Sequence, residues 1–250
     1  MTLITALVCC DGVVMASESQ ATTSATGTPV KQKTSKIKQC SNSPIIWGAA
    51  GDVSVIQKIE KELDRQISQM SNISTQLVVD IVKNAMVGIR QETISRYRGI
   101  YGSLIGDRKA PAAVTMVVGY EQSLPTIIII DQDGEDVDCH EFGYAAIGIG
   151  DIFAHSLLHN HKIGDITCLR GQVLAYKVIK EAIEVGAYGL GEPVDVWAIQ
   201  FADNKPKINH LSQEQINALE DTHDALKKLE INLFKELQMG EPSNTSSPDG

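Results

Sequence analysis

The second residue of the chain is a threonine, Thr2, and its position gives it chemistry that an internal threonine lacks. Because threonine is small, Met1 is a candidate for removal by an ordinary aminopeptidase, which would leave Thr2 with a free α-amine. The hydroxyl of such a residue can attack an acyl group while its own amine acts as the base. The pKa of an α-amine is about 7.7–8.0, close to working pH. Thr2 is therefore a candidate nucleophile, although its position alone favours an incidental second residue.

Three histidines crowd one predicted helix: His155, His159 and His161, with Asp151 one turn before the first. Histidines four residues apart on a helix can bind a metal ion. No carboxylate or cysteine completes a convincing ligand set, and a polar helix face or a subunit contact explains the histidines equally well. We predict no metal site and no cofactor.

Five cysteines are present, and neither their odd number nor their irregular spacing fits a disulfide framework or a zinc ribbon. A reducing compartment is the simpler interpretation. The apolar N-terminus lacks Lys and Arg, and Asp11-Gly12 interrupts it, so a secretory signal is not indicated. No stretch reaches the roughly 20 apolar residues that span a membrane. We expect a cytoplasmic protein with no membrane contact.

The charge of the chain argues against nucleic-acid binding. Its 250 residues carry a net charge of -9, with 43% hydrophobic and 21% charged residues. An acidic chain provides no broad positive field for phosphates. The short basic stretch from Lys31 to Lys38 is better interpreted as a solvated loop.

The first half of the chain predicts two strands, two helices and a return to strands. Apolar runs at 3–10 and 13–17 flank Asp11-Gly12, a hairpin signal in which glycine is expected to take a positive φ. Residues 19–33 indicate a loop. Asp52 is a plausible N-cap for a helix to Ile67, and a second helix is predicted over 74–98.

The second half predicts four strands (113–119, 126–131, 136–142 and 144–147), two helices (151–159 and 167–185) and two strands (194–200 and 206–210). Runs of strands followed by paired helices indicate segregated layers rather than βαβ units. The predicted fold class is α+β, with two stacked antiparallel sheets between outer helices.

A helix is predicted from Ser212 to Gln238, with Ser212 and Gln215 in a capping box. Residues 240–250 are rich in Pro, Ser, Asn and Gly and are predicted to be disordered. The expected organisation is one domain over 2–210, a helical extension over 211–239, and the tail 240–250.

Several segments, taken in order, carry a family resemblance: 2–8, 11–16, 18–22, 35–37, 48–51, 114–120, 125–134 and 146–150. They resemble the mature proteasome β subunit and, more closely, the HslV-type protease of bacteria, which also begins Met-Thr and has Gln-Ala-Thr after its acidic residue. The resemblance covers residues 2–210. It implies the four-layer αββα sandwich of N-terminal nucleophile (Ntn) hydrolases, in agreement with the predicted order of elements.

The resemblance implies catalytic roles for Thr2, Lys36 and Glu18. Thr2 is the nucleophile, and Lys36 matches the lysine whose ammonium lowers the pKa of the hydroxyl and assists proton transfer. Glu18 stands where the family has the aspartate that orients this lysine, and its extra methylene would require the lysine to shift. The alternatives are one more solvated lysine and a surface glutamate.

Further site residues follow from the same matching. The oxyanion donor is a backbone N–H of the Gly-rich turn, Ala50, or Gly51 if the alignment shifts by one. Substrate-binding positions include Ala21 and Gly48. Two departures count against full activity: Ile149 replaces the family's supporting serine, and the Arg-Asp…Ser-Gly segment has no counterpart in 186–191.

The resemblance implies a threonine peptidase that cleaves peptides or unfolded proteins through an acyl-enzyme, in a homo-oligomeric ring fed by an ATP-dependent unfoldase. The helical extension is expected to pack at a subunit contact or on the outside of the ring. Two alternatives stay open. One is a catalytically inactive, proteasome-like structural subunit, and the other is an Ntn hydrolase of small amides.

Overall fold

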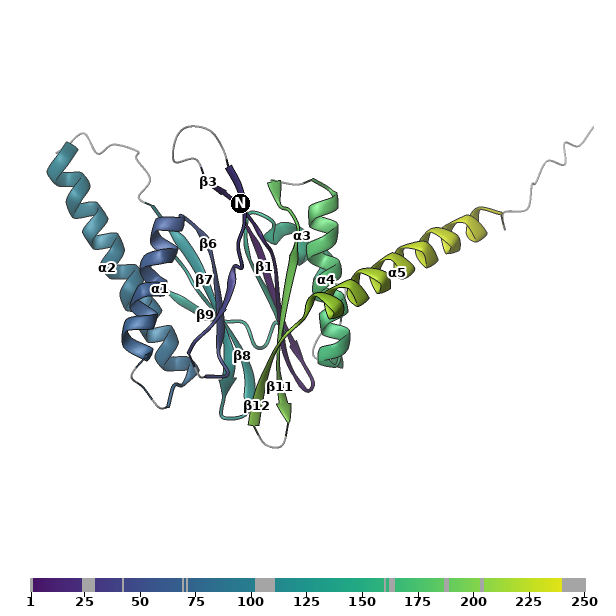
Figure 1. Cartoon of the computed structure of the whole chain (residues 1–250), viewed down its shortest axis with the longest axis horizontal. Coiled ribbons are helices and arrows are strands. Elements are labelled where there is room, and N and C mark those ends of the chain that lie inside the picture. The colour runs from purple at the N-terminus through teal and green to yellow at the C-terminus, as the bar shows by residue number, and fades with distance from the viewer. Residues whose placement is uncertain are drawn as a thin grey trace, which may run out of the picture.

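Two five-stranded antiparallel sheets stack face to face in the computed structural model, and helices cover both outer faces (Figure 1). Helices α1 and α2 lie on one side and α3 and α4 on the other. This arrangement confirms the predicted αββα sandwich. The structure describes residues 2–23, 30–41, 43–68, 70, 72–101, 111–159, 161, 165–186, 189–202 and 205–239.

The first sheet has the N-terminal hairpin near its centre, in the strand order β10-β1-β2-β11-β12. Every residue of β1 and β2 is buried, because side chains alternate between two covered faces. In β1, Leu3 and Leu7 pack toward the helices, while Ile4 and Ala6 pack between the sheets. The strands are β1 (Leu3–Cys9), β2 (Gly12–Glu18), β10 (Tyr144–Gly148), β11 (Val194–Ala202) and β12 (Lys205–His210).

The second sheet has the order β5-β6-β7-β8-β9. Its inner face supplies Ile46, Met116 and Ile127 to the core between the sheets. The predicted strand 136–142 is too long, since β9 ends at Asp138, and β5 was not predicted. The strands are β5 (Ile37–Gln39), β6 (Ile46–Gly51), β7 (Ala113–Glu121), β8 (Leu124–Ile130) and β9 (Asp136–Asp138).

A separate two-stranded ribbon follows the N-terminal hairpin: β3 (Gln20–Thr23) pairs antiparallel with β4 (Val30–Lys33). The prediction of a loop over 19–33 was therefore wrong for these two segments. Their Ser, Thr, Gly and Lys content gives no strand signal, and each segment is a strand because the other pairs with it.

The five helices match the predicted ones. Their bounds are α1 (Val53–Ile67), α2 (Thr75–Tyr101), α3 (Asp151–Leu158), α4 (Cys168–Glu184) and α5 (Gln213–Met239). The predicted capping box of α5 is present, since Ser212 N donates to Gln215 Oε1 at 2.9 Å and Gln215 N donates to Ser212 Oγ at 3.3 Å. Asp52 precedes α1, but its side chain makes no cap; Asp52 Oδ2 accepts from Ala112 N at 2.8 Å instead.

Helix α5 begins against the body and then projects away from it (Figure 1). Ile216 and Leu219 are buried with residues of α4 and the first sheet. The predicted disordered tail, 240–250, lies outside the described residues. In the part of the chain that the structure describes, no helix combines the length and apolar character needed to cross a membrane.

The turn between β1 and β2 differs from the prediction in one respect. Cys9 pairs with Gly12, so Cys10 and Asp11 form the turn and Gly12 already belongs to β2. Gly12 is not among the positive-φ glycines. A Cβ at this position would lie 2.2 Å from Ile199 O and 2.6 Å from Cys168 Sγ. Glycine is required here for close packing under β11 and α4, not for backbone conformation.

We therefore expect Gly12→Ala to destabilise the fold by about 2 kcal/mol, the usual cost of forcing extra volume into a packed core. The matched control is Gly88→Ala in α2, where an added Cβ meets no atom within 4 Å. Alanine should stabilise that helix by up to about 1 kcal/mol. Urea unfolding of both variants measures the difference, and equal midpoints would contradict the packing requirement at Gly12.

Candidate active site

Thr2 directly precedes β1, and the neighbouring backbone fixes its position. Leu3 pairs with Gly148 at the end of β10. Gly148 has a φ of 103°, and a Cβ there would lie 2.1 Å from the carbonyl oxygen of Thr2. Only glycine lets β10 run this close. The backbone of the candidate nucleophile is therefore held in place where it enters a buried strand.

Lys36 brings its ammonium group to Thr2 from a different part of the chain. Lys36 Nζ donates to Thr2 Oγ1 at 3.3 Å and to the carbonyl oxygen of Gln20 at 2.8 Å. It also forms an ion pair with the carboxylate of Glu18. Thus the structure brings together Thr2, Glu18 and Lys36, the three residues predicted to be catalytic, although they come from three separate segments.

The Lys36–Glu18 pair is shielded from solvent. The side chain of Lys36 is 8% exposed and that of Glu18 is fully buried. Burial lowers the pKa of Lys36 from its ordinary value, and the opposite charge of Glu18 counteracts part of this effect. The ammonium thus gives up a proton more readily than a surface lysine does. A group of this kind suits proton transfer with an adjacent hydroxyl.

Glu18 fits the site despite its extra methylene relative to aspartate. Its Oε1 faces Lys36, and its Oε2 accepts from the backbone N–H of Gln20 at 2.8 Å. Both carboxylate oxygens are thus occupied, which a buried charge needs. The ammonium of Lys36 stays within hydrogen-bond distance of Thr2, so the longer acid is accommodated.

The end of β6 approaches Thr2 across the space between the sheets. The Cβ of Ala50 lies 3.4 Å from the point where a Cβ on Gly148 would stand. Gly51 has a φ of 136°, and a side chain there would lie 2.3 Å from Ala112 O. Ala50 thus lies near the backbone that contacts Thr2, whereas Gly51 packs against Ala112. The role of Ala50 and Gly51 as oxyanion donors stays a prediction.

Gly48 and Ala21 are the two predicted substrate-binding positions. A Cβ on Gly48 would lie 2.9 Å from both Ile4 Cδ1 and Lys36 O, so this position faces the packed interior. Gly48 therefore lets the segment carrying Lys36 approach the first sheet, and only its backbone is available to a substrate. Ala21 lies in β3 opposite Gln32. Substrate binding at both positions stays a prediction.

Gln20 is a site residue that the sequence did not identify. Its backbone contacts both Glu18 and Lys36, while its side-chain Nε2 donates to Gly189 O at 2.8 Å. Ser19 N donates to Gly191 O at 3.3 Å. The segment 189–191, for which no family counterpart was found, therefore packs beside the Lys36–Glu18 pair. A Gln next to the acid was the available signal, but nothing local pointed to its partner 169 residues away.

Ile149 and His155 are the other residues that the sequence singled out. Ile149, in place of the family's serine, follows Gly148, whose backbone packs against Thr2, but it is 46% exposed and brings no hydroxyl. His155 packs its ring against Tyr144, with ring centroids 5.5 Å apart. Among the described residues, no group of three or more His, Cys, Asp or Glu side chains could hold a metal ion.

Comparison with known proteins places this geometry in a family. The model of the proteasome subunit family matches residues 2–197. The fold is similar to that of a Gly-1 mutant of Anbu from Hyphomicrobium sp. strain MC1, with a TM-score of 0.67 and 14% sequence identity, covering 95% of this chain and all of the other. No curated protein matches the sequence. The family match covers most of the chain, from Thr2 into β11, and includes every predicted catalytic residue, so the chain belongs to the proteasome subunit family.

Proposed function

We propose that the protein is a peptidase that cleaves amide bonds by acyl transfer to Thr2 once Met1 has been removed. The observation that carries this proposal is the 3.3 Å contact between Lys36 Nζ and Thr2 Oγ1, made by a lysine that is itself paired with buried Glu18. A hydroxyl, a cation and an orienting carboxylate in hydrogen-bond reach form the expected arrangement of an activated nucleophile.

The proposed reaction begins with attack of Thr2 Oγ1 on the substrate carbonyl carbon. The free α-amine of Thr2 takes the hydroxyl proton, and the ammonium of Lys36 stabilises the developing alkoxide. Lys36 then donates its proton to the leaving amine and regains a proton from the α-ammonium of Thr2, so the amine departs as the acyl-enzyme forms. Water attacks the ester and releases the acid. Backbone N–H groups near Ala50 and Gly51 would stabilise the oxyanion in both steps.

We also propose that the protein acts as a homo-oligomeric ring in the cytoplasm, on peptides or unfolded proteins supplied by an ATP-dependent unfoldase. Family membership supports the assembly. The exposed half of α5 gives it a physical basis. Leu226, Leu229, Leu233 and Phe234 are 42–65% exposed there, although Ile216 of the same helix is buried.

A second copy of this chain is the proposed partner for that surface. An isolated helix gains most of its stability from packing of an apolar face, so the projecting part of α5 needs a cover. A neighbouring copy packed on this segment would cover Leu226, Leu229, Leu233 and Phe234.

An inactive structural subunit is the main alternative, and Ile149 is the observation that favours it. A covalent threonine-directed probe, an epoxyketone or β-lactone, distinguishes an active peptidase from an inactive structural subunit. We expect intact-mass spectrometry to show loss of Met1 and one adduct, which Thr2→Ala abolishes. Thr2→Ser, which keeps a hydroxyl, is the matched control and should retain the adduct. A processed wild-type chain without adduct would favour the structural subunit, and cleavage of small amides but not peptides would favour the other hydrolase class.

Lys36→Arg tests the proton-transfer role. A guanidinium keeps the positive charge but does not give up its proton. We expect adduct formation to slow by roughly 10²-fold or more, the usual contribution of a positioned acid or base. Lys38→Arg is the matched control, because Lys38 pairs with Glu60 of helix α1 and not with Glu18. Quenched time courses analysed by mass spectrometry measure the rate of adduct formation. Equal rates in the two variants would rule out proton transfer by Lys36.

Leu229→Glu combined with Leu233→Glu tests assembly through α5. Both side chains are more than half exposed, so the fold should be kept while the complex dissociates. Ile100→Glu, at a 64% exposed position of α2, is the matched control. Light scattering after size-exclusion chromatography reports the mass, and an unchanged complex in the α5 variant would refute this interface.

A further inference from the structure

The residues that carry Lys36 to the site belong to no strand. Segment 34–36 lies between β4 and β5, and Ile37 is the first residue paired with the second sheet, opposite Gly48. Thr34 N donates to Ser19 O at 2.8 Å, which ties the start of the segment to the first sheet. The orientation of the Lys36 side chain therefore depends on the contacts of Ser35, the residue before it.

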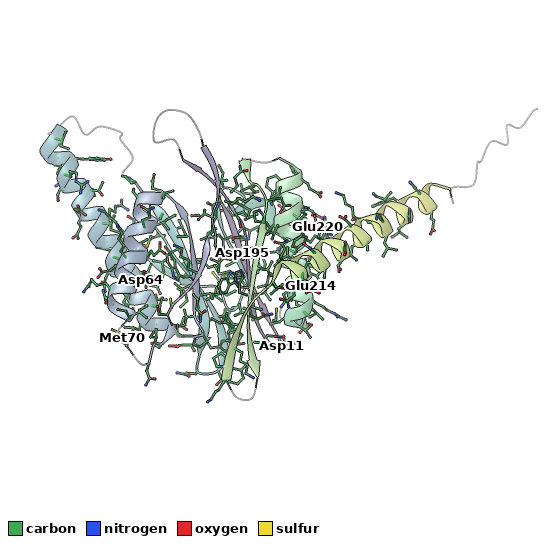
Figure 2. The ribbon with its side chains drawn as sticks, in the orientation of Figure 1. Asp11, Asp64, Met70, Asp195, Glu214 and Glu220 are labelled. Carbon is green, nitrogen blue, oxygen red and sulfur yellow. The ribbon has the colours of Figure 1, made fainter. Side chains whose placement is uncertain are left out.

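Ser35 is held by a carboxylate from the first sheet. Ser35 Oγ donates to Asp195 Oδ2 at 2.7 Å, and the side chain of Asp195 is 11% exposed. Asp195 lies on β11 within the sandwich (Figure 2) and pairs with Ser17 of β2. The adjacent pair in the register is Val194 with Glu18. The same two strands thus fix the acid that binds Lys36 and the acid that binds its neighbour.

Asp195 is itself held from the opposite side. Its Oδ1 lies 2.8 Å from Nε2 of His210, and the His210 ring stacks on Trp197 with centroids 4.0 Å apart and an interplanar angle of 7°. Stacking restricts rotation of the imidazole, so the carboxylate has a fixed neighbour on each oxygen. Asp195 is thus oriented to accept the Ser35 hydroxyl rather than free to turn toward solvent.

The hydroxyl of Ser35 has a second possible acceptor besides Asp195, and few atoms pack around its hydrogen bond to Asp195. Ser35 Oγ also lies 2.8 Å from Ile37 O, but its single proton serves one acceptor at a time, and the charged carboxylate is the stronger. A hollow of about 500 Å³ opens beside Ser35, Asp195 and His210. Without Asp195, the hydroxyl would turn back to its own segment, and the link to the first sheet would be lost.

We propose that Asp195 is a positioning residue for catalysis, which sets the direction of Lys36 toward Thr2 through the hydroxyl of Ser35. The proposal rests on the proposed function, since it assigns Asp195 to the same reaction. Asp195 touches neither the nucleophile nor the substrate-facing backbone described above. Its effect should therefore fall on the rate of bond formation and not on binding of the probe.

The test compares Asp195→Leu with Asp195→Asn in the Met1-processed full chain. Leucine has a similar shape but no acceptor, whereas asparagine keeps an oxygen for Ser35. We expect kinact for the threonine-directed probe to fall about tenfold in D195L with an unchanged KI, because small misplacements of a catalytic group have effects of this size. In D195N it should stay within about twofold of wild type. Equal losses in the two variants, or a changed KI with an unchanged kinact, would overturn the proposal.

Two further variants separate positioning from general destabilisation. Ser35→Ala should lower kinact as much as D195L, and the double variant should be no worse than either, since both remove one hydrogen bond. Asp136→Leu removes a carboxylate of β9, in the second sheet, that pairs with Lys83 of α2, and it should leave kinact unchanged. Additive losses in the double variant, or an equal loss in D136L, would contradict the assignment.

A crystal structure of D195L gives a readout that does not depend on activity. We expect Lys36 Nζ to leave hydrogen-bond range of Thr2 Oγ1, whereas D195N should keep the contact. If wild-type protein forms no adduct, the proposed function fails, but displacement of Lys36 in D195L alone would still support the positioning role. An unmoved Lys36 in D195L would overturn it whether or not the wild type reacts.

Discussion

The buried ion pair between Lys36 and Glu18 is the interaction on which the site depends. Removing two charges from water costs several kcal/mol for each ion, and their attraction seldom returns more than that. The pair is therefore a poor way to stabilise a fold. Here its remaining hydrogen-bonding capacity is directed at the backbone of Gln20 and the hydroxyl of Thr2. The arrangement makes physical sense as a means of holding a cation, with its pKa lowered by burial, beside one hydroxyl.

Glycines allow the close backbone approaches on both sides of this pair. At Gly48 a side chain would strike the backbone of Lys36, next to β5 of the same sheet, and the tip of Ile4 in the other sheet. At Gly148 it would strike the backbone of Thr2, which precedes the neighbouring strand. The positions of Lys36 and Thr2 thus depend on tight backbone packing at these two glycines, as well as on the two side chains.

Local sequence patterns were sufficient for the elements that carry an apolar pattern of their own, but not for the other strands or for the pairing between elements. The helix over 53–67 was predicted from its helical spacing. The strands predicted over 3–10 and 13–17 are present over 3–9 and 12–18, because a continuous apolar run suits a strand that is buried on both faces. The ribbon of β3 and β4 was missed, since neither strand carries an apolar pattern of its own. Gly12 was expected to serve the turn, whereas its role is contact with Ile199 and Cys168, residues far along the chain.

The same limit applies within the site. Thr2, Glu18 and Lys36 were found by resemblance to a family, and the structure brings them together. Gln20 with Gly189, and Ser35 with Asp195, are hydrogen-bonded pairs separated by 169 and 160 positions, and no spacing rule relates their members. Contacts of this kind follow from the register of β2 with β11. They become predictable only once that pairing is known.

The departures from the family pattern therefore need not leave the site unsupported. The family relies on hydroxyl and carboxylate side chains near the amine, and this chain has Ile149 and a Gly-rich segment there. Gln20 joins that segment to the Lys36–Glu18 pair through both its backbone and its amide. Backbone groups in paired or tightly packed segments lose less freedom on ordering than long side chains do. A site oriented in this way retains a fixed cation beside Thr2, and it is the α-amine of Thr2 whose surroundings have changed most relative to the family.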